Sequence, residues 1–436
     1  MTVASRLAPM AALALLVAPL AAQAPVALTL EEAIRRSEDV APTVVQARGS
    51  LRSAELGVRT QTWQYIPQIT FPVNADVLWS SGPSRVDPVT GDIISGNTTN
   101  PSYSFGANAS VTLFDGFGRS HDMGAARANE TAAEAGLVSA RFQNRLTVTN
   151  SFFDVLSNLE LLRVNEAAVE RAEQQLAIAS ARLQSGAGQR TDSLTALVQL
   201  GQARQQLLQA QATLATSEAS LARLTGVEGR VTAVDDSAFY RQPVLLDTTG
   251  IRIEAEASSP AIRSSLAALQ AAQAQLRSQK SNYWPTISAS ANNTWTAQKS
   301  NDYELEPRRN LRLSFSFSPW TSLQRETQIE NAAIQVDNRI ATLEDQRRQI
   351  AASLTQYYAS LANAREAIQV AQISVQAAQE NLRVTEQRYR LGVATVLELT
   401  QVQEQVTSAQ VQEVRARFDY LRAKAQIEAL IGRTLQ

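Results

Sequence analysis

The stretch Arg388-Tyr389-Arg390-Leu391-Gly392-Val393-Ala394-Thr395-Val396-Leu397-Glu398-Leu399 has a counterpart earlier in the chain. The counterpart begins Arg182-Leu183-Gln184-Ser185-Gly186, and the two glycines are 206 positions apart (392 minus 186). Leu224-Thr225-Gly226 and Leu430-Ile431-Gly432 keep the same offset. The chain is therefore predicted to contain two copies of one structural unit.

Apolar residues spaced by threes, fours and sevens lead into each glycine, a pattern typical of coiled-coil helices. They are Leu162, Val169, Ala172, Leu176, Ala179 and Leu183 in the first copy, and Ile368, Ala371, Val375, Ala378, Leu382 and Tyr389 in the second. A similar pattern follows the first glycine, from Leu200 to Leu221. Because glycine adopts the positive φ of a tight turn without strain, each copy is expected to end in a helical hairpin tip.

The first residues, 1–24, have the composition of a secretory signal peptide. Arg6 supplies a positive charge, an apolar run extends from Met10 to Leu20, and Ala22-Gln23-Ala24 is a small-residue cleavage sequence. No later segment approaches the ~18 uninterrupted apolar residues of a membrane-spanning helix.

The residue inventory argues against an enzyme. The chain has no cysteine, which excludes disulfides and thiol chemistry, and its single histidine, His121, cannot form a multi-histidine metal site. No cofactor or metal site is predicted. With 40 basic and 41 acidic residues, the chain has no net charge that would attract nucleic acid.

Each copy also contains two predicted strands. The first repeat covers 25–226 with strands at about 68–79 and 103–114, a connection follows at 227–258, and the second repeat covers 259–436 with strands at about 286–297 and 310–318. Pro67 and Pro285, which are 218 positions apart (285 minus 67), end a helix before the first strand of each repeat. Within the strands, apolar and polar residues alternate.

These strands have the length, alternation and terminal aromatic residues of membrane β-barrel strands, although an ordinary soluble sheet gives a similar pattern for one hairpin. No proline interrupts 118–185, so this segment can form one helix of about 68 residues, or ~100 Å, and a second such helix is expected over 322–391. Four strands cannot close a barrel, so several chains would have to share one. Arg119, Arg312 and Arg325, near the strand ends, are expected to be solvated rather than bound to lipid head groups.

Together, the signal peptide, the duplicated helix-strand-strand-helix unit and the paired glycine tips resemble the TolC-like outer membrane efflux protein family. The resemblance implies a mostly α fold with a small membrane β part: a trimeric α-barrel of long coiled-coil hairpins joined to a shared 12-stranded β-barrel. It places the chain in the outer membrane of a Gram-negative bacterium, in contact with outer membrane lipid, with its helices in the periplasm. The partners would be two further copies, a periplasmic adaptor (membrane fusion) protein, and an inner-membrane efflux pump or ABC transporter.

The resemblance also suggests site residues. The stretch Leu113-Phe114-Asp115-Gly116-Phe117-Gly118-Arg119 looks like the family's turn out of the second strand, whereas Phe317-Ser318-Pro319-Trp320-Thr321 departs from it. Adaptor-docking tips would comprise Leu183, Ser185, Gly186, Arg190, Tyr389, Leu391, Gly392 and Val393. Glu398 and Gln401 occupy the positions of the family's pore constriction, where three copies of Glu398 would form a cation-favouring ring. The alternative is one solvated carboxylate on a hairpin.

Three functions are compatible with this pattern. The first is a passive exit duct that conducts small molecules, such as drugs and toxic compounds, delivered by the pump. The second is the exit duct of a type I protein secretion system, which the sequence does not separate from the first. A soluble periplasmic coiled-coil scaffold is the alternative of another class, and it predicts water-soluble monomers or dimers.

Overall fold

The computed structural model describes residues 25–86, 88–89, 91, 93–94, 98–236, 239, 253, 255, 257–298 and 302–433. The predicted signal peptide lies outside the described residues, as does much of the connection at 227–258. The chain divides into two compact units. The first comprises Met1–Val40, Thr147–Arg241 and Ala364–Arg422, and the second comprises Ala41–Leu146, Gln242–Asn363 and Ala423–Gln436. Each unit therefore takes segments from both sequence repeats.

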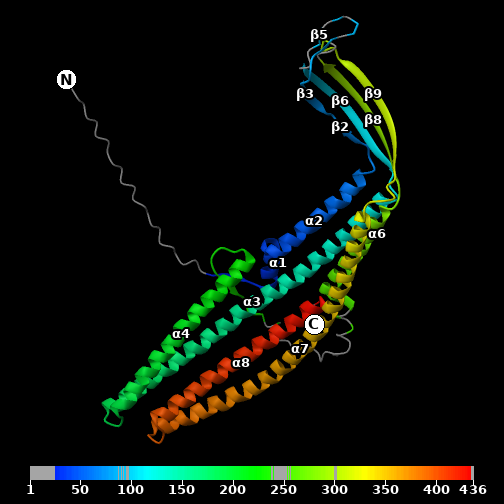
Figure 1. The fold of residues 1–436 in the computed structure, drawn as a ribbon. Helices are drawn as coiled ribbons and strands as arrows, with labels where there is room; N and C mark the ends of the chain where they lie inside the picture. Colours follow the sequence, from blue (N-terminus) through cyan, green and yellow to red (C-terminus); the bar gives the residue numbers. More distant parts are fainter. Residues whose placement is uncertain are drawn as a thin grey trace, which may run out of the picture. The chain divides into compact units, whose positions relative to one another are not determined.

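Four long helices dominate the fold: α3 (Gly118–Gln184), α4 (Arg190–Thr225), α7 (Gln324–Arg390) and α8 (Val396–Ile431). Both α3 and α7 are 67 residues long. This agrees with the prediction of two uninterrupted helices, and neither contains a proline to break its hydrogen bonds. Figure 1 shows α4 returning beside α3, and α8 beside α7. Among the described helices, none has the length and apolar content needed to cross a membrane.

The first unit also contains helix α1 (Leu30–Val40) and two short strands, β1 (Val26–Leu28) and β7 (Val231–Ala233), which pair in parallel. The backbone N–H of Glu32 donates to the Thr29 hydroxyl at 3.3 Å, so Thr29 caps α1. Gly226 ends α4 in the left-handed conformation, with φ of 68°. A Cβ there would lie 2.9 Å from the Val40 side chain, so the glycine also allows close packing against the end of α1.

In the second unit, helices α2 (Pro42–Trp63) and α6 (Pro260–Ser281) each begin on a proline and lead into the strands. A hydrophobic cluster forms where α6, α7 and α8 meet. Its buried members are Ala255, Ile262, Leu269, Leu343, Ile350, Leu354, Ile427 and Ile431. The helices are thus joined by the apolar residues that the periodicity places on their inner faces.

The sheet of the second unit contains β2 (Gln68–Thr70), β3 (Val73–Ser80), β6 (Thr98–Phe114), β8 (Thr286–Gln298) and β9 (Glu306–Ser316) (Figure 1). Both β2 and β3 pair with β6, which pairs with β8, which pairs with β9, all antiparallel. A separate small hairpin joins β4 (Arg85–Val86) and β5 (Ile93–Ile94).

The strand ends differ in detail from the predicted ones. The expected strand 68–79 is divided into β2 and β3 because Pro72 has no N–H to donate, although Pro72 still accepts a hydrogen bond from Gly106 N–H at 3.0 Å. Strand β9 starts four residues before the expected 310 and ends two before 318, since its pairing with β8 runs from Glu306 to Ser316.

The two faces of this sheet differ in polarity. Odd-numbered side chains on one face are mostly apolar and many are exposed, including Phe71, Val73, Trp79, Leu311, Leu313 and Phe315. Even-numbered side chains on the opposite face are mostly polar, including Asn74, Ser104, Asn108, Arg312 and Ser314. A large exposed apolar surface on a sheet indicates contact with a membrane or a partner.

The turns that connect strands to helices correct one expectation. Arg119 bonds to the Asp115 carboxylate at 2.9 Å and stacks on the Tyr65 ring at 4.8 Å. Arg325 is buried and stacks on Tyr283 at 4.0 Å. The expectation that these two arginines are solvated was therefore wrong, because each is held by an aromatic ring from the preceding helix end. Arg312 is exposed, as expected.

Candidate functional site

The two hairpin tips predicted from the duplicated glycines have the same backbone geometry. Gly186 has φ of 77° and Gly392 has φ of 78°, both in the left-handed region that other residues rarely adopt. Gly186 N–H donates to the Leu183 carbonyl at 3.1 Å, and Gly392 N–H donates to the Tyr389 carbonyl at 3.0 Å. Each glycine therefore closes the same turn at the end of its helix.

Arg182 joins the two tips within the first unit. Its Nη1 donates to the Tyr389 carbonyl oxygen at 2.6 Å, and its guanidinium lies 5.0 Å from the centre of the Tyr389 ring. A second, longer hydrogen bond runs from Arg182 Nη2 to the Ala187 carbonyl at 3.4 Å. One side chain of the first tip thus binds both turns.

Tyr389 is a buried support of the second tip. It is 2% exposed and packs in a cluster with Leu382, Ala394, Leu399, Val402 and Val406. Burial raises the pKa of the Tyr389 hydroxyl, and Asp192 raises it further, whereas the Arg182 guanidinium lowers it. Among the predicted docking residues, Tyr389 therefore positions the turn instead of offering its side chain to a partner.

The other predicted tip residues lie at the surface. Leu391 is 80% exposed, Val393 67% and Leu183 37%. Ser185, Gly186, Arg190 and Gly392 are exposed as well. An exposed apolar group beside two conformationally restricted turns is the kind of surface that binds a protein partner.

Glu398 has a local role that the sequence analysis did not anticipate. Its N–H donates to the Thr395 hydroxyl at 3.2 Å, and its carboxylate accepts the Thr395 N–H at 3.2 Å. This reciprocal pair is a capping box at the start of α8. Glu398 and Gln401 are both exposed, so the capping role leaves their side chains at the surface.

A polar network between the two hairpins was also missed from the sequence. Arg171 Nη2 donates to the Thr407 hydroxyl at 3.0 Å, and Gln175 Nε2 donates to the Thr400 hydroxyl at 3.3 Å. Farther along, Gln199 donates to Glu404 at 3.1 Å. Arg171 and Gln175 are one helical turn apart on α3, and their partners Thr407 and Thr400 are two turns apart on α8. This spacing does not identify the pairs without knowledge of how the hairpins pack.

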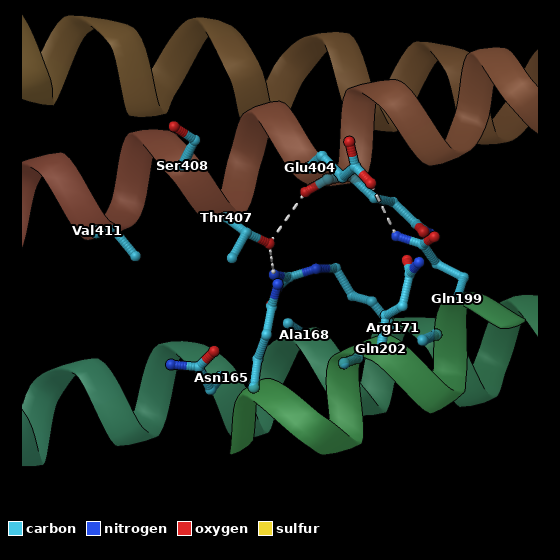
Figure 2. A pocket seen from close by; sticks show the side chains of 13 residues that line it. Asn165, Ala168, Arg171, Gln199, Gln202, Glu404, Thr407, Ser408 and Val411 are labelled. Carbon is cyan, nitrogen blue, oxygen red and sulfur yellow. Dashed lines mark hydrogen bonds between the residues drawn. The ribbon is translucent and has the colours of Figure 1, made fainter. Parts of the chain in front are cut away.

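Figure 2 shows a cavity beside two of these contacts, with Arg171 reaching across to Thr407 and Gln199 to Glu404. The cavity has a volume of about 550 Å³ and is lined by Asn165, Ala168, Arg171, Ala172, Gln199, Gln202, Ala203, Gln206, Gln403, Glu404, Thr407, Ser408 and Val411. Burial lowers the pKa of the Arg171 guanidinium, while Glu386 and Glu170 oppose this shift. The lining consists largely of amide and hydroxyl groups, which suit water or a polar solute.

The described residues contain no group of three or more His, Asp or Glu side chains that could hold a metal ion. The tips and the cavity offer hydrogen bonds, exposed apolar side chains and single charges. Such groups can bind and guide a molecule or a partner.

The chain belongs to the outer membrane efflux protein family, whose characteristic sequence pattern matches residues 33–227 and 252–433. This match confirms the predicted family resemblance. Members of the family are efflux-type outer membrane channels and are conduits, not enzymes, so the prediction of no enzymatic activity is confirmed as well. No curated protein shows significant sequence similarity to the chain.

Solved structures of such channels share the fold. CusC superposes with a TM-score of 0.78 at 16% identity, covering 93% of this chain and 92% of CusC. The CmeC outer membrane channel of Campylobacter jejuni superposes with a TM-score of 0.77 at 14% identity, covering 92% of this chain and 85% of CmeC. The MtrE outer membrane channel of Neisseria gonorrhoeae, solved in an open state, superposes with a TM-score of 0.74 at 16% identity, covering 93% of this chain and 89% of MtrE. The predicted fold class, mostly helical with a smaller β part, is thereby confirmed.

Proposed function

We propose that three copies of this chain form one channel through the outer membrane of a Gram-negative bacterium. In this assembly the strands share a 12-stranded β-barrel, and the long helices form an α-barrel in the periplasm. An inner-membrane pump or ABC transporter, connected through a periplasmic adaptor protein, would deliver the substrate. The protein itself supplies a passive path.

The observation that carries this proposal is the two-faced, open sheet. The sheet has an apolar face, exposed at Leu311 and Leu313, and a polar face that includes Arg312 and Ser314. Its edges, β2 with β3 on one side and β9 on the other, have no further strand partner among the described residues. Because unpaired backbone groups cannot face lipid, each edge needs the opposite edge of another copy.

The exposed tip residues supply the surface for the adaptor. Leu183, Leu391 and Val393 present apolar side chains next to the glycine turns. Gly186 and Gly392 keep the turns tight, and Arg182 fixes them against each other. We therefore assign docking to the exposed residues of both tips, together with Ser185 and Arg190, and positioning to Arg182 and Tyr389.

Glu398 and Gln401 form the constriction of the proposed pore. Both side chains are exposed near the second tip, and three copies of Glu398 would bring three carboxylates together around one axis. Like charges in a narrow mouth favour the passage of cations. Gln401 adds a neutral hydrogen-bonding side chain one helical turn later.

The proposed substrates are small molecules, such as drugs or toxic compounds. The family match supports an efflux-type channel. A host strain that lacks its own exit duct tests the assignment: expression of this chain with its pump and adaptor should restore resistance to a panel of toxic compounds. If resistance is not restored while an unfolded protein is exported, the type I secretion duct is the correct function.

Planar-bilayer recording tests the channel itself. The purified protein should form discrete, ohmic conductance steps. Leu313→Arg puts a charge on the apolar face, which costs ~2–4 kcal/mol near the bilayer midplane and should prevent channel formation. Ser314→Arg, the matched control, puts the same charge on the polar face and should still conduct. Absence of conductance by the wild type, or equal behaviour of the two variants, would contradict the proposal and favour a soluble scaffold.

A further inference from the structure

One charged residue lies on the apolar face of the sheet. The paired odd-numbered positions of β8 and β9 are Ile287, Ala289, Ala291, Asn293, Trp295, Ala297, Pro307, Arg309, Leu311, Leu313 and Phe315. The odd-numbered residues of β3 and of β6 up to Val111 carry no charge either. Arg309 is thus the one ionised side chain on this face among the described strand residues.

Arg309 lies in a defined row across the sheet. It pairs with Asn293, which pairs with Ala107. The register of the neighbouring pairs, Ile69 with Ala109 and Val73 with Phe105, places Phe71 opposite Ala107. Asn293 Oδ1 is buried and has no hydrogen-bond partner among the described residues. An unpaired acceptor and an ion without a carboxylate partner are both costly in an apolar setting.

A groove begins at this row. It has a volume of about 550 Å³. Its lining consists of the apolar residues Ile69, Ala107, Ala109, Ala291 and Leu311, the amides Asn108, Asn292, Asn293 and Asn310, and Arg309. The three alanines leave a depression between larger neighbours. The groove is apolar along Ala109 and Ala291, and it is charged only at the Arg309 end. A lipid with an anionic head group has matching parts: its acyl chain suits the apolar stretch, and its head group suits the positively charged Arg309 end.

The position along the strand fits a head group. Phe105 and Trp295 stack with ring centres 5.2 Å apart, and Trp295 pairs with Pro307, two residues before Arg309. Aromatic rings of this kind mark the water interface of membrane strands. Arg309 therefore lies about 7 Å inside an aromatic row, within reach of lipid phosphates by extension of its side chain.

We propose that Arg309 and Asn293 bind the phosphate end of a phosphorylated outer-leaflet lipid, whose acyl chain lies in the groove over Ala109 and Ala291. This rests on the proposed function, because it requires the apolar face to contact the membrane. Arg309 supplies the charge-assisted hydrogen bonds. The unpartnered Oδ1 of Asn293, in the same row, accepts a hydrogen bond from a hydroxyl of the lipid head group.

The test is lipid binding to the purified, detergent-solubilised protein, measured by native mass spectrometry. The probes are diphosphorylated lipid A, the same lipid without phosphates, and inorganic phosphate. The wild type should prefer phosphorylated over dephosphorylated lipid A by about tenfold, the ratio expected for one charge-assisted contact. Arg309→Gln should reduce this preference to roughly one, whereas Arg309→Lys should retain part of it.

Arg308→Gln is the matched control. It removes the same charge one residue earlier, on the polar face, where Arg308 pairs with Thr294. This variant should keep the tenfold preference. A bulky residue in the groove, Ala291→Phe, should weaken binding of both lipid forms.

Equal lipid preference in Arg309→Gln and Arg308→Gln would overturn the site, and so would displacement of the lipid by inorganic phosphate alone. Every variant is also recorded in planar bilayers. Channels that conduct but show no phosphate preference contradict only the lipid site. A wild-type protein that never conducts contradicts the proposed function instead.

Discussion

The guanidinium of Arg182 donates a hydrogen bond to the Tyr389 carbonyl oxygen at 2.6 Å, across the two hairpin tips. The residues are 207 positions apart in sequence. Because Arg182 also contacts the Ala187 carbonyl and the Tyr389 ring, it holds both turns at once. This contact makes the tips one surface, which is the premise of the proposed docking site.

Arg182→Ala should therefore loosen the second tip. Loss of a charge-assisted hydrogen bond typically costs about 1.5–3 kcal/mol, so amide hydrogen exchange around 389–394 should speed up by one to two orders of magnitude. Arg190→Ala removes an equally charged side chain from the first tip, where Arg190 is exposed, and should leave this exchange unchanged. Unaltered protection of 389–394 in Arg182→Ala would contradict the positioning role.

Replacing both tip glycines should abolish efflux while the proposed trimer remains intact. Gly186→Leu with Gly392→Leu forces a left-handed conformation on residues that resist it, at about 1–2 kcal/mol each. A Cβ at Gly186 would meet no atom within 4 Å, and one at Gly392 would meet Arg182 Nη2 at 3.4 Å, an ordinary contact with a flexible side chain. The cost of the double variant is therefore mainly in the backbone. Gly201→Leu, in helix α4 with equally open surroundings, is the control. Full efflux activity in the double variant would refute adaptor docking at the tips.

Charge at Glu398 can be separated from its capping role. Glu398→Gln keeps a side chain that can accept the Thr395 N–H, so helix stability should change little. Cation preference, measured as a reversal potential in a salt gradient, should fall. Glu398→Ala should lose the preference and also about 0.5–2 kcal/mol of local helix stability. Unchanged selectivity in Glu398→Gln would eliminate the carboxylate ring.

Alkaline pH should destabilise the second tip through Tyr389. Burial raises its pKa in the folded protein, so the folded tip holds a proton that the unfolded chain releases. The stability from this group is present below the unfolded pKa of ~10 and is lost as the pH rises through the folded value. Tyr389→Phe cannot ionise, so its melting temperature should fall less between pH 9 and 11. An equal fall in melting temperature in the wild type and in Tyr389→Phe would show that ionisation of Tyr389 is not the cause.

Gly116 should be the least tolerant glycine of the strand-to-helix turn. Its φ is 65°, and a Cβ would lie 2.2 Å from the Trp284 Cβ. Gly116→Ala should therefore lower stability by on the order of 2–4 kcal/mol through strain and overpacking. Gly136→Ala, on α3 with no atom within 4 Å of the added Cβ, should be neutral or stabilising. The measurement is the free energy of thermal unfolding of both variants. An unchanged stability of Gly116→Ala would contradict the prediction and show that the turn rearranges to accept the Cβ.

Local features of the fold were predictable from sequence because their causes are local. Gly186 and Gly392 specify turns by their φ, Thr29 caps the helix that follows it, and Pro42 and Pro260 begin helices. The alternation of apolar and polar residues along each strand likewise predicts that one face of the sheet is apolar and the other polar. Periodicity and turn residues are properties of neighbouring positions, so they can be read without a structure.

Long-range polar contacts could not be predicted in the same way. The contact of Arg182 with Tyr389 requires knowing that the two tips lie together. Arg119 was expected to be solvated, yet it stacks on Tyr65, which is distant in sequence. The pair of Arg171 and Thr407 spans 236 positions. Each residue alone has the sequence context of an ordinary exposed helix position, and only the packing of the hairpins gives it a partner.

The most direct test of the shared channel is the size and location of the expressed protein. The chain is produced with its predicted signal peptide in a Gram-negative host, the outer membrane is extracted with detergent, and the native mass is measured. We predict a detergent-dependent trimer in the outer membrane fraction. A water-soluble periplasmic monomer would contradict the shared barrel and, with it, the conduit and the Glu398 ring.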